Sequence, residues 1–283
     1  LDESDAALEL PAVDIGIYAL EIPATHPTFP VESGRAYRLR VVAQDGRTYE
    51  SLPDRLSPVP QATDLAVEIV EQEVFNAEGE AELLPLIQFS IDTPLRTAEG
   101  GLSPRLRWES FRTFRLTDVS QKEQTCYITE PTNVGRLNLL DAGQLNAGVV
   151  EDLPIARELI TYFFAEGYYL TVYQESLSPE AFRYWNEVNE LLERSGSIFE
   201  PPAGKVKSNL RNVENPDDEV FGLFYAVEQD TIRTYVSPEF AGNLPDYCPP
   251  PVGPGGLDDS HVCADCLENA EVSTLTRPDF WVE

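Results

Sequence analysis

Residues 168–200 read YYLTVYQESLSPEAFRYWNEVNELLERSGSIFE, and this stretch holds the strand and the helix on which the predicted fold depends. Residues 168–173 alternate with the period of a pleated strand and are apolar or aromatic on both sides, which predicts a strand packed on both faces. Ser178-Pro179-Glu180 favours a helix start, because serine can accept from a free N–H, proline has a preset φ, and glutamate faces the positive end of the dipole. Gly196 provides a stop, so we predict a helix over residues 178–195.

The predicted helix is amphipathic. Its apolar residues recur with a period of 3.6, whereas the opposite face carries charges spaced four residues apart. We therefore expect the helix to pack on a sheet through four side chains, Phe182, Trp185, Val188 and Leu192.

The rest of the chain favours strands. It contains 23 prolines and 17 glycines in 283 residues, which suits a β protein with many loops. The predicted fold class is mainly β of the α+β kind: a β-sandwich with one amphipathic helix packed on it, plus an incomplete N-terminal Ig-like β module.

Three regions follow from the strand pattern and the prolines. Residues 1–60 carry short strands and the Asp45-Gly46 signal of a tight hairpin. Since a lone hairpin is unstable in water, we expect that more of this module precedes Leu1 or that the hairpin docks on the main body. A proline-rich linker leads into the main β-rich domain, residues 61–243, and a loop-rich tail forms residues 244–283.

Strands are expected within the main domain over residues 64–75, 84–92, 105–118 and 126–128. Two hairpins are also predicted. One joins residues 160–164 to 168–173 across Glu166-Gly167, and the other joins residues 220–227 to 231–236 across Gln229-Asp230.

The charge of the chain excludes some partners. Lys and Arg number 20 and Asp and Glu number 49, a formal net charge of −29. Such a surface repels nucleic acid and anionic lipid headgroups, so we expect neither as a ligand.

Catalytic motifs are missing from the sequence. The two histidines are His26, in a loop before a proline, and His261, and no P-loop, HExxH, serine elbow or dinucleotide fingerprint occurs. We therefore expect no enzyme and no cofactor. A secreted hydrolase with a pair of carboxylates stays open as a third hypothesis, because only the tertiary structure gives their separation.

Four cysteines, Cys126, Cys248, Cys263 and Cys266, allow three interpretations. Disulfides would restrain a tail that is too rich in proline and glycine to bury much apolar surface. A zinc site could use Cys248, His261, Cys263 and Cys266, and Cys263-x-x-Cys266 could be a redox pair. We favour disulfides, and the sequence does not select their connectivity. Near the end of the sequence, Phe280 and Trp281 are a candidate interface, although we favour the interpretation that they dock on their own domain.

The sequence also resembles a known family. The run from Gln174 to Trp185, the run from Gly196 to Pro202, Cys126-Tyr127 and the close Arg277-Pro278-Asp279-Phe280-Trp281 are similar to a Bacteroidota lipoprotein family, catalogued as domain of unknown function 4249. The family's early β-sandwich region is matched at residues 16–18, 34–39 and 45–49. Members often place a cysteine where this chain has Arg211 and Asn212.

The resemblance implies a function that no motif here demonstrates. The precursor would carry a lipoprotein signal and a lipidated cysteine upstream of Leu1, which would anchor the protein at the cell surface of the outer membrane. The family is commonly encoded beside TonB-dependent receptors. The leading hypothesis is thus a non-enzymatic accessory subunit of such a transporter in nutrient capture or uptake. The alternative is a structural or adhesive component of a surface assembly, built through open strand edges.

Overall fold

The structure is a computed structural model, and it describes residues 1–75, 79–96, 104–119, 122–132, 135–193, 205–245, 247–248, 263–267 and 272–282. Its strands are β1 Ala12–Asp14, β2 Ile17–Tyr18, β3 Ala36–Tyr37, β4 Arg40–Val42, β5 Thr48–Ser51, β6 Asp54–Arg55, β7 Asp64–Phe75, β8 Ala81–Pro94, β9 Arg105–Thr117, β10 Thr125–Pro131, β11 Asn138–Asp141, β12 Val149–Leu159, β13 Tyr168–Leu177, β14 Leu210–Asn212, β15 Glu228–Val236 and β16 Ser273–Thr274. The α-helix is α1 Pro179–Glu193, and short 3-10 helices span Ala142–Gln144 and Tyr162–Phe164. Among the described residues, no helix is both long enough and apolar enough to span a membrane.

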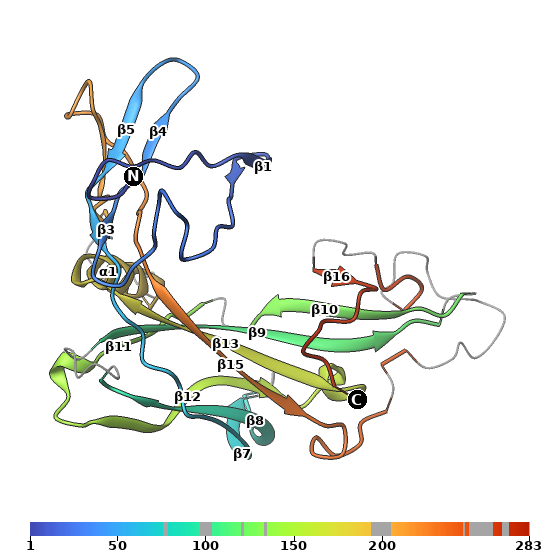
Figure 1. Ribbon diagram of the computed structural model, residues 1–283. Coiled ribbons are helices and arrows are strands. Elements are labelled where there is room, and N and C mark those ends of the chain that lie inside the picture. Colours follow the sequence, from blue (N-terminus) through green and yellow to red (C-terminus); the bar gives the residue numbers. More distant parts are fainter. Residues whose placement is uncertain are drawn as a thin grey trace.

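Two antiparallel sheets form the sandwich that the sequence predicts. The main sheet has the order β15-β13-β9-β10-β16, and the second sheet has the order β12-β8-β7. β9 is long enough to pair along one edge with two strands, β11 beside residues 105–108 and β10 beside residues 111–117. The prediction of a mainly β sandwich with a helix is confirmed (Figure 1).

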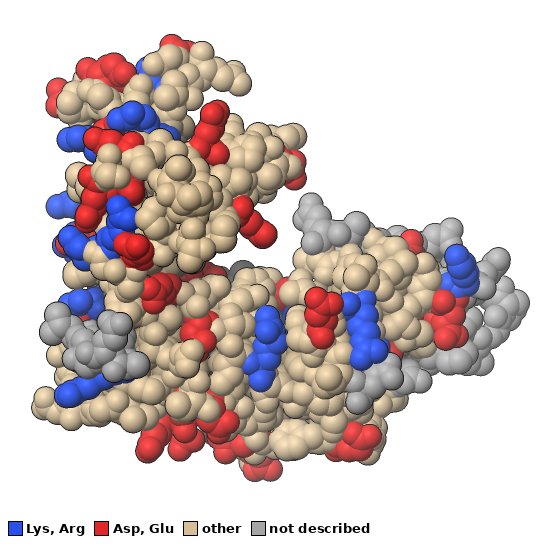
Figure 2. Space-filling view, viewed as in Figure 1, with Lys and Arg blue, Asp and Glu red and all other residues tan. Residues whose placement is uncertain are grey.

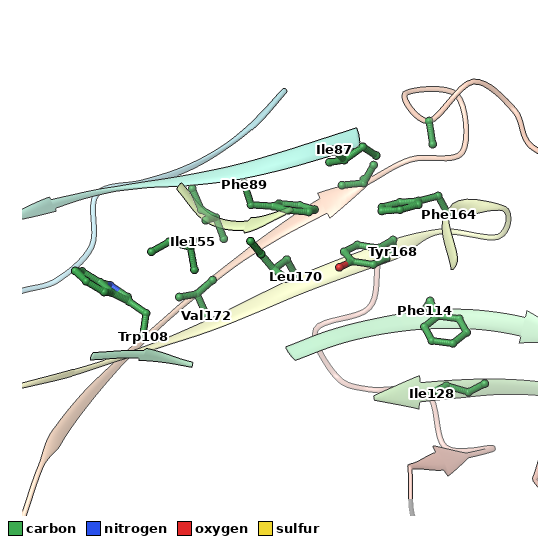
Figure 3. Packing of buried hydrophobic residues seen from close by; sticks show 14 of the residues in the cluster. Ile87, Phe89, Trp108, Phe114, Ile128, Ile155, Phe164, Tyr168, Leu170 and Val172 are labelled. Carbon is green, nitrogen blue, oxygen red and sulfur yellow. The ribbon is translucent and has the colours of Figure 1, made fainter. Parts of the chain in front are cut away.

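The core lies between these sheets because the inward residues of β13 and β8 are large and apolar (Figure 3). Tyr168 is fully buried, and its ring stacks at 4.3 Å on Phe164 and at 5.7 Å on Phe89, measured between ring centroids. Leu170 and Val172 continue the same side of the strand. β13 is buried on almost every residue, as expected for a central strand.

The N-terminal module is completed by a distant segment. The predicted hairpin is present as β4–β5, with Gly46 in the left-handed region at φ +88°. Its third strand is β14, whose residues 210–212 pair with residues 49–51 of β5. Residues 1–60 therefore do not form the module alone, because a segment from the predicted main domain returns to close the sheet.

The proline-rich linker is fixed against the main sheet. The Val59 and Ala62 N–H groups donate to the carboxylates of Glu228 and Asp230, both on β15, at 3.2 and 2.8 Å. The buried Gln174 amide donates to the Pro60 carbonyl oxygen at 2.6 Å. The connection between the N-terminal module and the sandwich is consequently held by hydrogen bonds.

Both predicted hairpins around the central strand are wrong. Residues 160–167 cross from β12 in the second sheet to β13 in the main sheet, so they join two layers. Residues 220–226 form no strand. They run beside the N-terminal module, where the Asn209 side-chain amide donates to the Phe224 carbonyl oxygen and accepts from the Phe224 N–H. In both cases the alternation of the sequence identified an apolar segment but not its partner. β13 pairs with β9 and β15, and β15 pairs with β13.

The helix packs less closely than predicted. It begins at Pro179, as expected, and the Ser178 hydroxyl accepts from the Ala181 N–H at 3.1 Å. Of the predicted contact residues, Phe182, Trp185 and Val188 are partly buried, whereas Leu192 is 48% exposed. The Leu192 prediction is wrong: α1 lies at the junction of the N-terminal module and the sandwich (Figure 1), and Leu192 is exposed to solvent there. Residues 194 and 195 lie outside the described residues.

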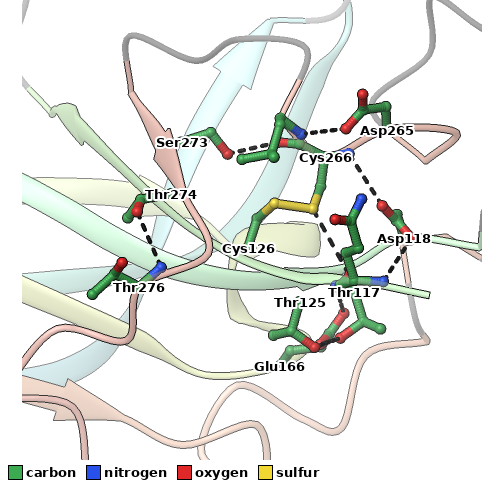
Figure 4. The surroundings of a disulfide bond; sticks show 12 residues. Thr117, Asp118, Thr125, Cys126, Glu166, Asp265, Cys266, Ser273, Thr274 and Thr276 are labelled. Carbon is green, nitrogen blue, oxygen red and sulfur yellow. Dashed lines mark hydrogen bonds between the residues drawn. A yellow bond between two sulfur atoms is a disulfide. The ribbon is translucent and has the colours of Figure 1, made fainter. Parts of the chain in front are cut away.

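Two disulfides restrain the tail, one to the sandwich and one within residues 244–283, which confirms the favoured interpretation of the cysteines. Cys126 on β10 bonds to Cys266, and Cys248 bonds to Cys263. Around the first bridge, the Asp118 carboxylate accepts from the Gln124 and Cys266 N–H groups at 2.9 and 3.4 Å (Figure 4). The tail also adds β16 to the edge of β10, so part of residues 244–283 belongs to the main sheet.

Candidate binding groove on the outer sheet face

The candidate site lies on the face of the main sheet that points away from the core. Strand alternation directs Leu170 and Phe114 inward, so their neighbours Thr171 and Thr113 face outward. Across the sheet, the paired strands line up their outward side chains in rows: Phe111 is opposite Thr171, and Thr113 is opposite Thr129. The outward face therefore carries aromatic rings and hydroxyls at its centre.

A groove of about 430 Å³ runs over these residues. It is lined by five sheet residues and two from the tail: Phe111, Thr113, Thr129, Thr171, Tyr173, Pro278 and Phe280. In Figure 1 the chain after β16 turns back over β10 and β9, and Figure 2 shows the surface hollowed between the N-terminal module and the end of the sandwich that carries β16. The groove is thus bounded on one side by the C-terminal tail.

The lining of the groove combines ring edges and faces with hydroxyl groups. Phe111 and Tyr173 meet edge-on with their centroids 5.7 Å apart. The Thr113 and Thr129 hydroxyl oxygens are 3.0 Å apart, and each hydroxyl keeps further hydrogen-bonding capacity. This is the composition of a ligand site, in which apolar rings supply contact area and a few polar groups fix orientation.

Arg233 gives the groove a positive rim. Its Nε donates to the Thr171 hydroxyl at 3.1 Å, and its guanidinium carbon lies 4.6 Å from the Phe280 ring centroid. Among the residues that the structure describes, it makes no ion pair with a carboxylate. A cation stacked on an aromatic ring and free of a carboxylate partner attracts anionic groups.

The tail that forms the wall is firmly docked. Trp281 is 3% exposed, and its ring lies 5.1 Å from those of both Tyr127 and Tyr169. Gly167 makes room for it, because φ is +106° there and a Cβ would lie 3.3 Å from the Trp281 ring and 2.9 Å from the Tyr235 hydroxyl.

The two candidate interface residues, Phe280 and Trp281, therefore have different roles. Trp281 is buried on its own domain and offers no exposed recognition surface, so the interface interpretation is wrong for this residue. Phe280 is partly buried and lines the groove.

At the other end of the outer face, a buried arginine anchors the helix. Arg107 donates to Glu175 at 2.9 Å and to the Tyr225 hydroxyl at 2.8 Å, and it stacks 4.0 Å from the Trp185 ring centroid. Burial raises the pKa of the Glu175 carboxyl, although the guanidinium opposes that shift. The contact with Arg107 therefore keeps the Trp185 ring against the main sheet, although most residues of α1 are only partly buried or exposed.

A second buried ion pair lies between the two sheets. Arg112 on β9 donates to Glu158 on β12 at 2.9 Å and to Glu130 at 2.9 Å. Burial also raises the pKa of Glu158. Since Arg112 faces inward and Arg107 outward, Glu158 and Glu175 lie on opposite sides of the main sheet, and they do not face one cleft.

The zinc alternative is contradicted. Cys248, Cys263 and Cys266 are all consumed in disulfides, and a disulfide sulfur cannot supply the thiolate that zinc requires. The same bonds leave no free thiol pair at Cys263-x-x-Cys266 in this state. His261 lies outside the described residues. Within the described part of the chain, no group of three or more His, Cys, Asp or Glu residues is arranged to hold a metal ion.

Sequence reasoning missed the lining of the groove except for Phe280. Phe111, Thr113, Thr171 and Tyr173 sit at outward positions of strands that were correctly placed, apart from the ends of β13. The signal that could have found them is the lack of charge there, because an outward-facing strand position on a chain so rich in acid is normally charged.

The fold and groove define a class: a two-layer β-sandwich with an appended N-terminal β module and an open groove on one outer face. The sequence profile of the domain of unknown function (DUF4249) matches residues 4–233, so the chain belongs to that family. Neither a curated protein nor a solved structure matches the chain.

Proposed function

We propose that this chain is a non-enzymatic lipoprotein of the outer-membrane surface that serves as an accessory subunit of a TonB-dependent transporter in nutrient capture or uptake. The observation that carries the proposal is the groove, whose aromatic lining, threonine hydroxyls and adjacent Arg233, which makes no ion pair with a described carboxylate, suit a ligand with an apolar or ring face and an acidic group. The surface location and the transporter partner are part of the proposal and rest on the resemblance described under the sequence analysis.

Two features of the groove support ligand capture over chemistry. Its described lining contains rings, hydroxyls and a proline but no titratable carboxyl or histidine. Three described carboxyls have a raised pKa, and none of them lines the groove: Glu158 and Glu175 are each paired with an arginine, and Asp54 accepts from the Ala226 N–H at 2.8 Å. A hydrolase would need two carboxyls across one cleft, so this third hypothesis has little support.

The transporter partnership is tested by purification of the tagged chain from native membranes in a mild detergent. We expect a TonB-dependent barrel receptor to elute with it in stoichiometric amount. Elution of the chain as a monomer without any receptor would contradict the proposal.

The groove is tested in the same preparation by native mass spectrometry. The double variant Tyr173→Ala/Phe280→Ala should keep the receptor but lose a small-molecule adduct that the wild type carries. Leu275→Ala is the matched control, because Leu275 is 48% exposed and does not line the groove. An adduct that survives in the groove variant would place the ligand elsewhere.

The alternative function, a structural or adhesive component, has one specific observation in its favour. Among the strands that the structure describes, β7 pairs only with β8, and exposed apolar residues lie on these two strands, with Phe75 at 74% and Leu83 at 62%. However, Glu68, Glu71 and Glu73 also line β7, and charges on an edge strand oppose pairing between subunits. Small-angle scattering of the pure protein tests this alternative. Ordered self-association would support a structural or adhesive role, and a strictly monomeric profile would contradict it.

A further inference from the structure

A second surface, made of other residues than the groove, is formed by the β1–β2 hairpin of the N-terminal module. The two strands pair with each other and turn at Gly16, which has φ +74°. No third strand among the described residues joins them. In Figure 1 the hairpin projects from the module away from β4 and β5.

The hairpin exposes an apolar surface of unusual extent for its size. Ile15 is 97% exposed, and five neighbouring side chains are between 41% and 62% exposed: Leu10, Val13, Ile17, Tyr18 and Leu20. An isolated two-stranded hairpin is marginal in water, and contiguous exposed apolar residues mark interaction sites. The surface therefore has the character of a contact that is covered in the working protein.

The charges around this surface define what would cover it. Residues 1–34 contain no Lys or Arg. Elsewhere in residues 1–60 every acid except Asp54 has a cationic partner, as Asp2 has Arg35 at 3.0 Å, but Glu9, Asp14 and Glu21 around the hairpin have none among the described residues. Figure 2 shows the projecting part as tan with red and no blue.

We propose that the β1–β2 hairpin is a docking element for another protein, whose contact surface is apolar and flanked by lysine or arginine. Such a rim would neutralise Glu9, Asp14 and Glu21 while the apolar centre buries Ile15 and its neighbours. A second copy of this chain is a poor partner because each copy carries a net charge of −29. Anionic lipid headgroups are repelled for the same reason.

This inference goes beyond the proposed function, because it requires neither a transporter nor a ligand. The hairpin residues are separate from the lining of the groove, which lies on β9, β10, β13 and the tail. If the partner is the barrel receptor, the hairpin is the contact through which the accessory chain binds it.

The test is site-specific photo-cross-linking of the full chain in intact cells of its source. A photoreactive amino acid replaces Ile15, and a matched chain carries it at Phe75, which is also an exposed apolar residue on a hairpin. We expect one discrete protein adduct from position 15, mapped by mass spectrometry to an apolar peptide with flanking Lys or Arg. The adduct should fall roughly tenfold when Ile17→Glu and Tyr18→Glu are added.

Two further measurements keep the test independent of folding. The thermal unfolding of the Ile17→Glu/Tyr18→Glu chain should match that of the parent, because both side chains are exposed. A variant that removes only charge, Asp14→Asn/Glu21→Gln, should lower the adduct yield and its dependence on salt.

An adduct with lipid, an adduct with a second copy, no adduct, or equal adducts from positions 15 and 75 would overturn the inference. An adduct with a protein other than a TonB-dependent receptor would uphold it and contradict only the proposed partner.

Discussion

At the scale of single residues, adjacent positions in this chain have different roles because the backbone turns their side chains to different surroundings. Phe280 lines the groove, while Trp281 fills a pocket on Tyr127 and Tyr169. Likewise Arg107 and Arg112 lie on one strand but face opposite sides of the main sheet, and each is paired with a buried glutamate. The type of amino acid alone does not predict which of these roles a residue has.

The buried Glu158 predicts a pH dependence of stability with a definite sign. Burial raises its pKa above the ordinary value of 4.5, so the folded state binds the proton more tightly than the unfolded state. Its contribution to the free energy of unfolding is therefore fully present below about pH 4.5 and is lost as the pH rises through the raised pKa. Glutamine cannot titrate, so the stability of the wild type relative to Glu158→Gln should increase as the pH falls from 8 to 4.

Urea denaturation at several pH values measures this difference. Glu73→Gln, an exposed position on β7, controls for the loss of one negative charge. A stability difference that grows toward high pH would mean that the Arg112 ion pair outweighs the burial of Glu158.

At the scale of elements, the tail is ordered by covalent links that span very different lengths of chain. The Cys126–Cys266 bridge joins residues 140 apart, whereas Cys248–Cys263 joins residues 15 apart. The loop-entropy account then predicts that the long bridge restricts the unfolded chain more, by about 5 kcal/mol against about 3 kcal/mol.

The two bridges can be compared directly by substitution. Cys126→Ala/Cys266→Ala should lower the free energy of unfolding more than Cys248→Ala/Cys263→Ala, by about 2 kcal/mol. Urea denaturation measures both, with the oxidised wild type as reference. Equal losses, or a larger loss from the short bridge, would contradict this ranking.

At the scale of the whole molecule, the net charge of −29 opposes compactness. Raising the ionic strength from about 0.01 to about 0.15 M shortens the screening length from about 30 to about 8 Å. Less self-repulsion should stabilise the folded state, and about 1 kcal/mol would raise Tm by about 2–4 °C.

Calorimetry in NaCl measures this shift, with choline chloride as the matched salt. Equal effects of the two salts are expected from screening. A fall in Tm with salt, or an effect confined to sodium, would contradict it.

Much of the fold follows from local pattern. The strands at residues 64–75 and 105–118 were placed nearly to the residue, because their alternation is strong over many positions. The helix start at Pro179 follows from its capping residues. The paired cysteines were expected as disulfides, since the tail has too little apolar surface to hold itself.

The sequence by itself predicted the long strands at residues 64–75 and 105–118, the start of the helix, the acidic composition and the disulfide-bonded state of the cysteines, because those depend on residues close in the chain or on total composition. Only the tertiary structure decided that β14 closes the N-terminal sheet, that residues 160–167 cross between layers, and which cysteines pair. It also assembled the groove from three strands and the tail. The physical reason is that these features join residues far apart in the chain, and alternation records which face a side chain takes but not which strand lies beside it.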